Sequence, residues 1–313
     1  SFGAIRGHVI QGSPLMPGAL YLEILAEVGR LASEKEVTTV RNVIWRNPTV
    51  VTQPRSIYAD LARSGDAVTI RLSADVPSEG SCAFQGEITI FGARKPSSER
   101  VDIAALRSGL GFRLDKAAVY ERFAEVGMNY GPQIQPIEEA FVSETELLSH
   151  LRLPQDWASG LSYDLHPSLL DGAFQSVAVS AMGSGQHGKM RRATVPLGLD
   201  SLTIHAPIPH ECYVQVTPRS GGSFTEVLGQ KLAKYSVRIL DPLGNVVIDI
   251  GGFSGMAVSD PKGSDSATRS SRPAAEARER SDTHDPVLGL LTALEKGVVS
   301  QELVTKALSE QDA

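Results

Sequence analysis

The sequence predicts an α+β fold built from two similar halves, each an antiparallel sheet wrapped around one central helix. Each half contains one apolar stretch with helical spacing, at residues 17–32 and 167–181. Each stretch is followed by β-branched or alternating segments that end at Pro, Gly, Asn or Asp. The parts occur in the same order, since "VIWRNPTVV" corresponds to "LDSLTIHAPIP" and "FQGEITIF" to "VIDIGGFSG". We therefore expect an internal duplication whose two sheets lie side by side.

The first half, residues 1–98, contains the helix that begins at Pro17. The apolar residues Tyr21, Leu25 and Val28 recur on one helical face, and further leucines make the other faces apolar too. We therefore expect the sheet of this half to surround the helix. Its strands are predicted at "TTVRNVIW", "SIYADLA", "AVTIRLSA" and "AFQGEITIF".

The second half, residues 113–258, follows a connector at 99–112 that loses the strand alternation. It opens with a short helical stretch, "DKAAVYERFAEVG". Its central helix is "HPSLLDGAFQSVAVSAMG", where Leu170, Phe174 and Val177 repeat at helical spacing. Its strands are predicted at "IEEAFVSE", "ELLSHLRL", "LDSLTIH", "CYVQVTP", "LAKYSVRIL" and "NVVIDIGGFSGMAV".

Two further segments follow the second half. Residues 259–285 contain no aliphatic side chain larger than Ala and no Phe, Trp or Tyr, so burial cannot offset the entropy of ordering them. We expect a flexible linker there. Residues 286–313 carry two short apolar stripes at helical spacing and are predicted to form helices that dock on another chain or domain. The alternative is a tail that packs back on its own domain.

Composition excludes several classes of function. The formal net charge is −6, so the chain offers no basic field for a nucleic acid. Its two cysteines, Cys82 and Cys212, form neither a disulfide framework nor the paired spacing of a zinc site. No apolar run approaches the roughly 18 residues of a membrane span, and we expect a cytoplasmic protein. Because a motif follows Ser1 within ten residues, we expect a piece of a longer chain.

His8 is the first candidate catalytic residue. It stands in "GHVIQGSPLMPGALYLEIL", just before a turn and the helix start at Pro17 and Gly18. The first N–H groups of a helix lack intrahelical acceptors, so they suit a carbonyl oxygen or an oxyanion. A histidine beside them is suited to removing a proton from the neighbouring carbon. The alternative is a structural histidine beside an ordinary turn.

Asp171 and Gln175 are the second candidate pair. They stand four residues apart in "DLHPSLLDGAFQ" and therefore share one face of the second central helix. A carboxyl group in an apolar helix needs a partner, and burial favours its protonated form. Gln175 is placed to orient that carboxyl. The alternative is an aspartate stabilised by the macrodipole near a helix N-terminus.

His8 and the Asp171–Gln175 pair together indicate a catalytic site more strongly than either does alone. If the halves are joined, His8 and Asp171 face each other across the seam as a general base and a general acid for an elimination. Tyr130, on the Gly-Pro turn of "GMNYGPQI", is placed to hydrogen-bond a substrate oxygen or, alternatively, to close the turn by packing. The remaining histidines show no metal-ligand spacing, so no metal site is predicted.

These segments, in this order, resemble the dehydratase domains of modular polyketide synthases. His8, Gly12 and Pro17 match the HxxxGxxxxP pattern of that family. "GMNYGP" resembles its GYxYGP element, and Asp171 with Gln175 matches its DxxxQ pattern. The resemblance covers roughly the first 258 residues, and the joint occurrence of the three motifs makes it specific.

The resemblance implies a double hotdog fold and the removal of water from a 3-hydroxyacyl chain. That chain is carried by thioester on the phosphopantetheine arm of an acyl carrier protein, and the product is a 2,3-enoyl thioester. His8 is then expected to take the α-proton and Asp171 to protonate the leaving hydroxyl, supported by Gln175 and Tyr130. No bound cofactor is implied. The implied partners are the carrier protein, neighbouring synthase domains and a second copy in a homodimer, without nucleic acid or membrane.

Two positions depart from the family pattern. Met128 replaces the first tyrosine of the GYxYGP element, and Ile134 stands where an aromatic residue is common. With Gly131 and Pro132, these residues are expected to shape the substrate pocket. The departures therefore concern substrate preference more than proton transfer.

Other readings remain open. A related enzyme would close an oxygen ring by adding a hydroxyl to the new alkene, or would shift a double bond; such relatives often lose the motif proline or the acid, whereas Pro17 and Asp171 are present. A second class is a silent scaffold or carrier-binding domain. The tail "LLTALEKGVVSQELVTKAL" resembles segments between domains in synthases whose acyltransferase acts in trans, which implies a role in association or docking.

Overall fold

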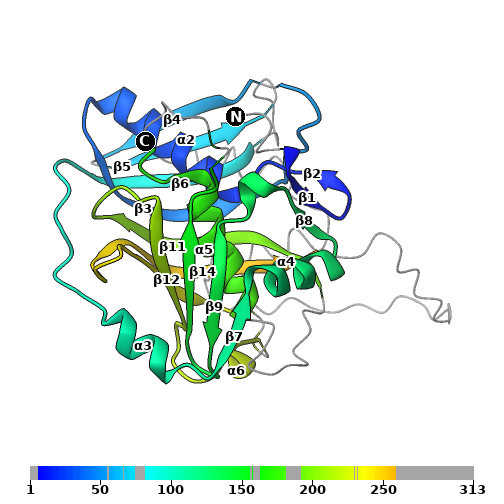
Figure 1. Cartoon of the computed structure of the whole chain (residues 1–313). Helices are drawn as coiled ribbons and strands as arrows, with labels where there is room; N and C mark the ends of the chain where they lie inside the picture. Colours follow the sequence, from blue (N-terminus) through cyan, green and yellow to red (C-terminus); the bar gives the residue numbers. More distant parts are fainter. Residues whose placement is uncertain are drawn as a thin grey trace, which may run out of the picture. The chain divides into compact units, whose positions relative to one another are not determined.

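The architecture predicted from the sequence is confirmed in a computed structural model of the chain (Figure 1). Eleven strands form one continuous antiparallel sheet in the order β4-β5-β6-β3-β11-β14-β13-β12-β10-β9-β7. The structure describes residues 6–258 except 55, 66, 75–81, 156, 158–162, 181–191, 229 and 231. The predicted linker at 259–285 and the predicted helical tail at 286–313 lie outside the described residues.

The first half of the sheet surrounds helix α2 (Gly18–Ser33). Leu22 and Leu25 on this helix are fully buried, as expected for a helix whose apolar residues face a surrounding sheet. Each such buried leucine contributes roughly 1.5–3 kcal/mol. The strands of this half are β3 (Val37–Trp45), β4 (Tyr58–Ser64), β5 (Ala67–Ser73) and β6 (Cys82–Phe91).

The second half surrounds α5 (Pro167–Ser180), of which every residue is buried. A helix buried on all sides needs partners for its polar groups, and the hydroxyl of Ser176 donates to Gly172 O and accepts from the hydroxyl of Ser149. The strands of this half are β7 (Phe112–Asp115), β9 (Ile137–Val142), β10 (Leu147–Arg152), β11 (Thr194–Ile204), β12 (Glu211–Pro218), β13 (Tyr235–Leu240) and β14 (Val246–Ala257).

The halves are joined at a seam between β3 and β11. The two strands pair antiparallel, with Val43 opposite Leu199 and Gly198 opposite Ile44. Gly198 is required there, because a Cβ at this position would lie 2.9 Å from Val43 O. Trp45, at the end of β3, packs edge-on against Phe174 of the second half, with ring centroids 5.9 Å apart. Backbone pairing and core packing therefore both hold the halves together.

A small second sheet lies beside the large one. It consists of β2 (Ser13–Pro14), β1 (His8–Ile10) and β8 (Met128–Tyr130), in that order. The N-terminal strand β1 thus pairs with a strand of the second half, with His8 directly opposite Tyr130. At Gly131 the two segments come so close that a Cβ would lie 2.9 Å from the Gly7 Cα. This sheet places a first-half residue against the second-half helix.

Short elements complete the described part of the chain. The predicted connector contains helix α3 (Ile103–Gly109), whose N-cap Asp102 accepts from Ala105 N. The other elements are α4 (Lys116–Glu125), the 3-10 turn η1 (Pro132–Ile134) and α6 (Phe224–Leu228). Within the described residues, none of the helices combines the length and apolar character that a membrane crossing requires.

Candidate active site at the seam between the halves

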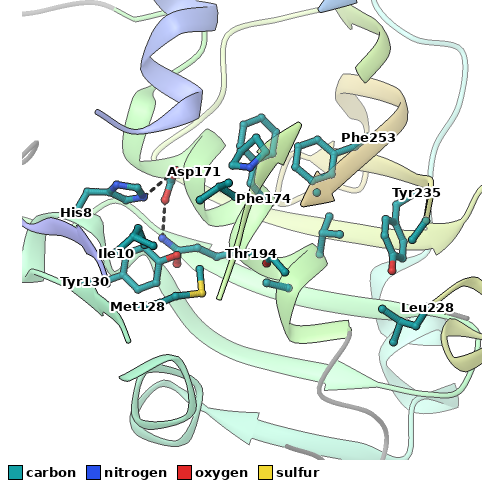
Figure 2. A pocket seen from close by; sticks show the side chains of 17 residues that line it. His8, Ile10, Met128, Tyr130, Asp171, Phe174, Thr194, Leu228, Tyr235 and Phe253 are labelled. Carbon is teal, nitrogen blue, oxygen red and sulfur yellow. Dashed lines mark hydrogen bonds and ion pairs between the residues drawn. The ribbon is translucent and has the colours of Figure 1, made fainter. Parts of the chain in front are cut away.

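A cavity of about 110 Å³ lies where the small sheet and α5 meet strands β11, β13 and β14. One end is polar and formed by His8, Tyr130, Asp171 and Gln175 (Figure 2). Figure 2 shows Leu228 and Tyr235 at the other end, with Phe174 and Phe253 between the two ends. The remaining lining residues are Ile10, Met128, Val177, Ala178, Thr194, Val195, Pro196, Ala233 and Gly255. The reactive groups therefore stand at one end of a largely apolar pocket.

His8 is held in the tautomer of a base. Its Nδ1 lies 3.0 Å from the carbonyl oxygen of Leu15, which can only accept a hydrogen bond. Nδ1 must therefore carry the hydrogen, and Nε2 of the neutral ring is left with a free lone pair. The turn between β1 and β2 makes this contact, since Gly12 adopts φ 78° and Leu15 N donates back to His8 O. The ring is only 8% exposed.

Asp171 faces His8 from the other half. Its Oδ1 lies 4.0 Å from His8 Nε2, and the residue is 4% exposed. Burial raises the pKa of Asp171 above its ordinary value of 3.8, although His8 and Gln175 oppose this shift. Burial thus makes the protonated form of Asp171 easier to populate than that of a solvated aspartate. Such a carboxyl group is suited to donating a proton beside a histidine nitrogen that can accept one.

Gln175 holds the other oxygen of this carboxyl group. Its Nε2 donates to Asp171 Oδ2 at 2.8 Å and to Ile134 O at 3.1 Å. Its Oε1 accepts a hydrogen bond from the Tyr120 hydroxyl at 3.0 Å. The amide is thus satisfied on both sides although it is 2% exposed. Oδ1 of Asp171 remains free to face His8 and the cavity.

Tyr130 stands on the same wall as His8. Their ring centroids are 5.5 Å apart, and the Tyr130 backbone is fixed by Gln135, whose side chain donates to Tyr130 O. Burial raises the pKa of the Tyr130 phenol well above its ordinary value, with Asp171 as a smaller cause. The phenol is therefore a neutral donor beside the His8–Asp171 pair.

Of the other predicted site residues, only Met128 lines the cavity. Gly12, Pro17 and Gly18 do not line it. Gly18 instead packs against Pro196 and Trp45, where a Cβ would lie 2.9 Å from Pro196 Cγ. The expected role of this helix start as a carbonyl-binding group therefore has no support in the cavity lining.

Gly131, Pro132 and Ile134 do not line the cavity either. Ile134 ends the turn η1 and is buried in the core, where its carbonyl accepts from Gln175. Ile134 therefore contacts α5 through this hydrogen bond. Of the four residues expected to shape the pocket, Met128 alone lines this cavity.

Neither the role of Tyr120 nor the apolar lining of the cavity was predicted from the sequence. Tyr120 is one of several apolar or aromatic residues on α4, and only its bond to Gln175 sets it apart. Phe174 and Phe253 stack with centroids 4.6 Å apart, although they are far apart in sequence. Phe174 was visible as an apolar position next to Asp171, but nothing in the sequence shows that Phe253 on β14 reaches it.

The arrangement brings together a nitrogen that can accept a proton and a carboxyl group that can donate one. His8 Nε2 and Asp171 Oδ1 face each other 4.0 Å apart, so one ligand bound in the cavity could contact both. The largely apolar lining suits an acyl chain. The geometry therefore fits proton abstraction at one carbon coupled to protonation of a leaving group at the next.

Two family descriptions match the sequence. "Polyketide synthase dehydratase N-terminal domain" matches residues 98–265, and "Polyketide synthase dehydratase domain" matches residues 3–76. Among curated proteins, polyketide synthase PksN of Bacillus subtilis is 27% identical over 269 residues, which cover 79% of this chain and 4% of PksN. PksM of the same species is 26% identical over 264 residues, covering 80% of this chain and 6% of PksM. The chain thus spans a small fraction of these relatives.

Solved structures share the fold. A trans-AT polyketide synthase dehydratase domain from Brevibacillus brevis aligns with a TM-score of 0.71 at 24% identity, covering 82% of this chain and 90% of that one. The CurK dehydratase of the curacin polyketide synthase aligns with a TM-score of 0.67 at 20% identity, covering 82% and 88%. Two further CurK structures are described as inactive mutants, one with a histidine replaced by phenylalanine and one with an aspartate replaced by asparagine.

Proposed function

Because the chain belongs to the family of polyketide synthase dehydratase domains, we propose that it removes water from a 3-hydroxyacyl thioester to give a 2,3-enoyl thioester. The observation that carries this proposal is the pairing of His8 Nε2, on a ring whose Nδ1 is held by Leu15 O, with a buried Asp171 carboxyl group, 4.0 Å apart, at one end of an apolar cavity. The inactive CurK variants support it, since they alter the same two residue types.

The proposed reaction begins at the carbon next to the thioester carbonyl. His8 Nε2 takes a proton from C2, and the electron pair of the C2–H bond forms the C2–C3 double bond. The C3–O bond breaks, and the hydroxyl leaves as water with the proton of Asp171. His8 is then an imidazolium and Asp171 a carboxylate, and return of the proton from Nε2 to Oδ1 restores the starting state.

Neighbouring side chains support each step. The Leu15 carbonyl accepts from Nδ1–H and stabilises the imidazolium that forms. Gln175 donates to Oδ2 and stabilises the carboxylate that Asp171 becomes. We assign to the Tyr130 phenol, which lines the same end of the cavity, a hydrogen bond to the β-hydroxyl or to the thioester carbonyl. Both proton transfers are assigned to side chains, so the proposed reaction requires no metal or nucleotide.

The proposed partners follow from the family. An acyl carrier protein would present the substrate on its phosphopantetheine arm, and neighbouring synthase domains and a second copy of the chain are further proposed partners. The apolar lining between Phe174 and Leu228 is suited to the hydrocarbon part of the bound chain.

The test is to incubate the protein with 3-hydroxyacyl carrier proteins of both hydroxyl configurations and to follow the mass of the acyl group. Loss of one water is the expected result. Water loss followed by a product of unchanged mass and new retention time would identify an added cyclase or isomerase activity. No water loss from either stereoisomer, with the protein folded, would contradict the proposal and favour a silent scaffold.

A further inference from the structure

Tyr120 is a partly buried tyrosine outside the proposed catalytic pair, and its hydroxyl is hydrogen-bonded inside the fold. It lies on α4 behind the cavity wall and does not line the cavity. Its oxygen accepts a hydrogen bond from Ile137 N at 3.0 Å and donates to Gln175 Oε1 at 3.0 Å. Burial raises the pKa of its phenol well above the ordinary value, so the hydroxyl keeps its proton. Tyr120 is therefore a fixed donor aimed at Gln175.

The hydrogen-bond directions around Gln175 determine which way its amide faces. The carbonyl of Ile134 can only accept, so it must face the Gln175 NH₂ group. The Ile137 N–H already uses an acceptor site on the Tyr120 oxygen, so the phenol hydrogen points to Gln175 Oε1. Ile134 thus fixes the amide nitrogen of Gln175, and Tyr120 fixes its amide oxygen. The second N–H of the amide then points to Asp171 Oδ2. A flipped amide would direct a carbonyl oxygen at that carboxyl group.

We propose that Tyr120 is a positioning residue for the acid step, acting through Gln175. By fixing the amide, it holds Asp171 Oδ2 and leaves Oδ1 to face His8 and the leaving hydroxyl. The expected effects on turnover rest on the proposed dehydration activity. It extends the site by one residue that never touches the substrate.

The variant Tyr120→Phe tests this role. It keeps the ring, whose centroid lies 6.1 Å from that of Phe123 and 6.0 Å from that of Tyr130, and removes only the hydroxyl. We expect kcat to fall about tenfold, the size of one lost hydrogen bond, with KM unchanged within about twofold. The carboxylate of Asp171 loses a fixed donor, so the alkaline limb of the pH profile should move to higher pH. An unchanged kcat and pH profile would overturn the proposal.

Tyr21→Phe is a matched control. Tyr21 is buried and its hydroxyl donates to Thr49, but it lies on α2 and does not line the cavity. Both variants lose a side-chain hydrogen bond inside the fold and should unfold at lower temperature. Only Tyr120→Phe should change kcat and the pH profile. Equal losses of kcat in the two variants would indicate a purely structural role for Tyr120.

A double-mutant cycle with Gln175→Leu shows whether Tyr120 acts through Gln175. In the Gln175→Leu background, Tyr120→Phe should leave kcat unchanged, while the unpaired Ile137 N–H still lowers the unfolding temperature. Additive losses of kcat would contradict the coupling.

A readout without turnover separates this inference from the proposed function. In protein labelled with ¹³C at aspartate carboxyl groups, NMR titration should give Asp171 a higher pKa in Tyr120→Phe than in the wild type. If the wild type fails to dehydrate its substrates but this shift is seen, the proposed function falls and the positioning role stands. An unchanged Asp171 pKa removes the positioning role, whatever the turnover.

Discussion

At the scale of single residues, the site depends on which atom carries a proton. His8 is suited to act as the proposed base because its Nδ1–H donates a hydrogen bond to the Leu15 carbonyl and leaves Nε2 to accept a proton. Asp171 is suited to act as the proposed acid because burial raises its pKa despite the opposing effects of His8 and Gln175. The same residue types on a solvated surface would have neither property. The three sequence motifs indicated this pair, but they do not predict the hydrogen bond of His8 to Leu15 or that of Tyr120 to Gln175.

Asp171→Asn should change stability with a defined dependence on pH. The pKa of Asp171 in the folded state is raised above its ordinary value of 3.8. The carboxyl group of Asp171 therefore contributes fully to stability below pH 3.8, and this contribution is lost as the pH rises through the folded-state pKa. The unfolding temperature of Asp171→Asn should therefore increase relative to the wild type over that window. Thermal unfolding followed by circular dichroism from pH 4 to 8 measures this difference.

Glu211→Gln supplies a control of opposite sign. The pKa of Glu211 is lowered by hydrogen bonds from His150 and Arg152, so its contribution is lost as pH falls. Its variant should be the less stable one at neutral pH and approach the wild type in acid. A constant difference for Asp171→Asn across the range would contradict a neutral, buried carboxyl group.

At the scale of elements, periodicity predicted the long segments well and the short ones poorly. The helices α2 and α5 and strands such as β3, β12 and β14 were visible because each spans several repeats of its pattern. The strands β1, β2 and β8 have two or three residues, which is too short for any period. That small sheet nevertheless carries His8 and Tyr130, so the element that completes the site was the one the pattern could not reveal.

Helix α5 fits its sheet so closely that one added methyl group should disturb the site. A Cβ at Gly172 would lie 2.5 Å from Pro136 Cγ and 2.7 Å from Leu151 Cδ2. We expect Gly172→Ala to lower the free energy of unfolding by about 1–3 kcal/mol and to reduce kcat, because α5 also carries Asp171 and Gln175. Denaturant titration and the water-loss assay measure the two effects.

Gly109→Ala, in helix α3, is the matched control for Gly172→Ala in α5. Gly109 ends α3 with no atom within 4 Å of an added Cβ, so its replacement should change stability by less than about 1 kcal/mol and leave kcat unchanged. Equal effects of the two substitutions would contradict the tight seating of α5.

At the scale of the whole described molecule, the duplication predicted from the order of parts is present, and the two sheets share the β3–β11 seam. The bidentate pair of Arg94 with Asp164 adds a charged link between the halves. The sequence indicated that the sheets merge, but the pairing register depends on Gly198 and on contacts such as Trp45 with Phe174, which only the fold brings together.

A continuous sheet predicts that the two halves unfold together. The chain has two tryptophans, Trp45 in the first half and Trp157 in the second. In Trp157→Phe and Trp45→Phe, the remaining indole reports its own half. In each variant, the midpoint of denaturant unfolding by fluorescence should coincide with that by far-ultraviolet circular dichroism. Separate midpoints would show that the halves are independent domains.

The central claim is that His8 and Asp171 act as base and acid on one substrate, and one measurement tests it most directly. Wild type, His8→Ala and Asp171→Asn are incubated with the 3-hydroxyacyl carrier protein that the wild type dehydrates, and the loss of water is followed by mass. Tyr21→Phe, at a residue that does not line the cavity, is the control. We expect Tyr21→Phe to retain water loss and each of the other variants to lose it by at least about 10²-fold while remaining folded. Turnover near the wild-type rate in either His8→Ala or Asp171→Asn would contradict the assignment.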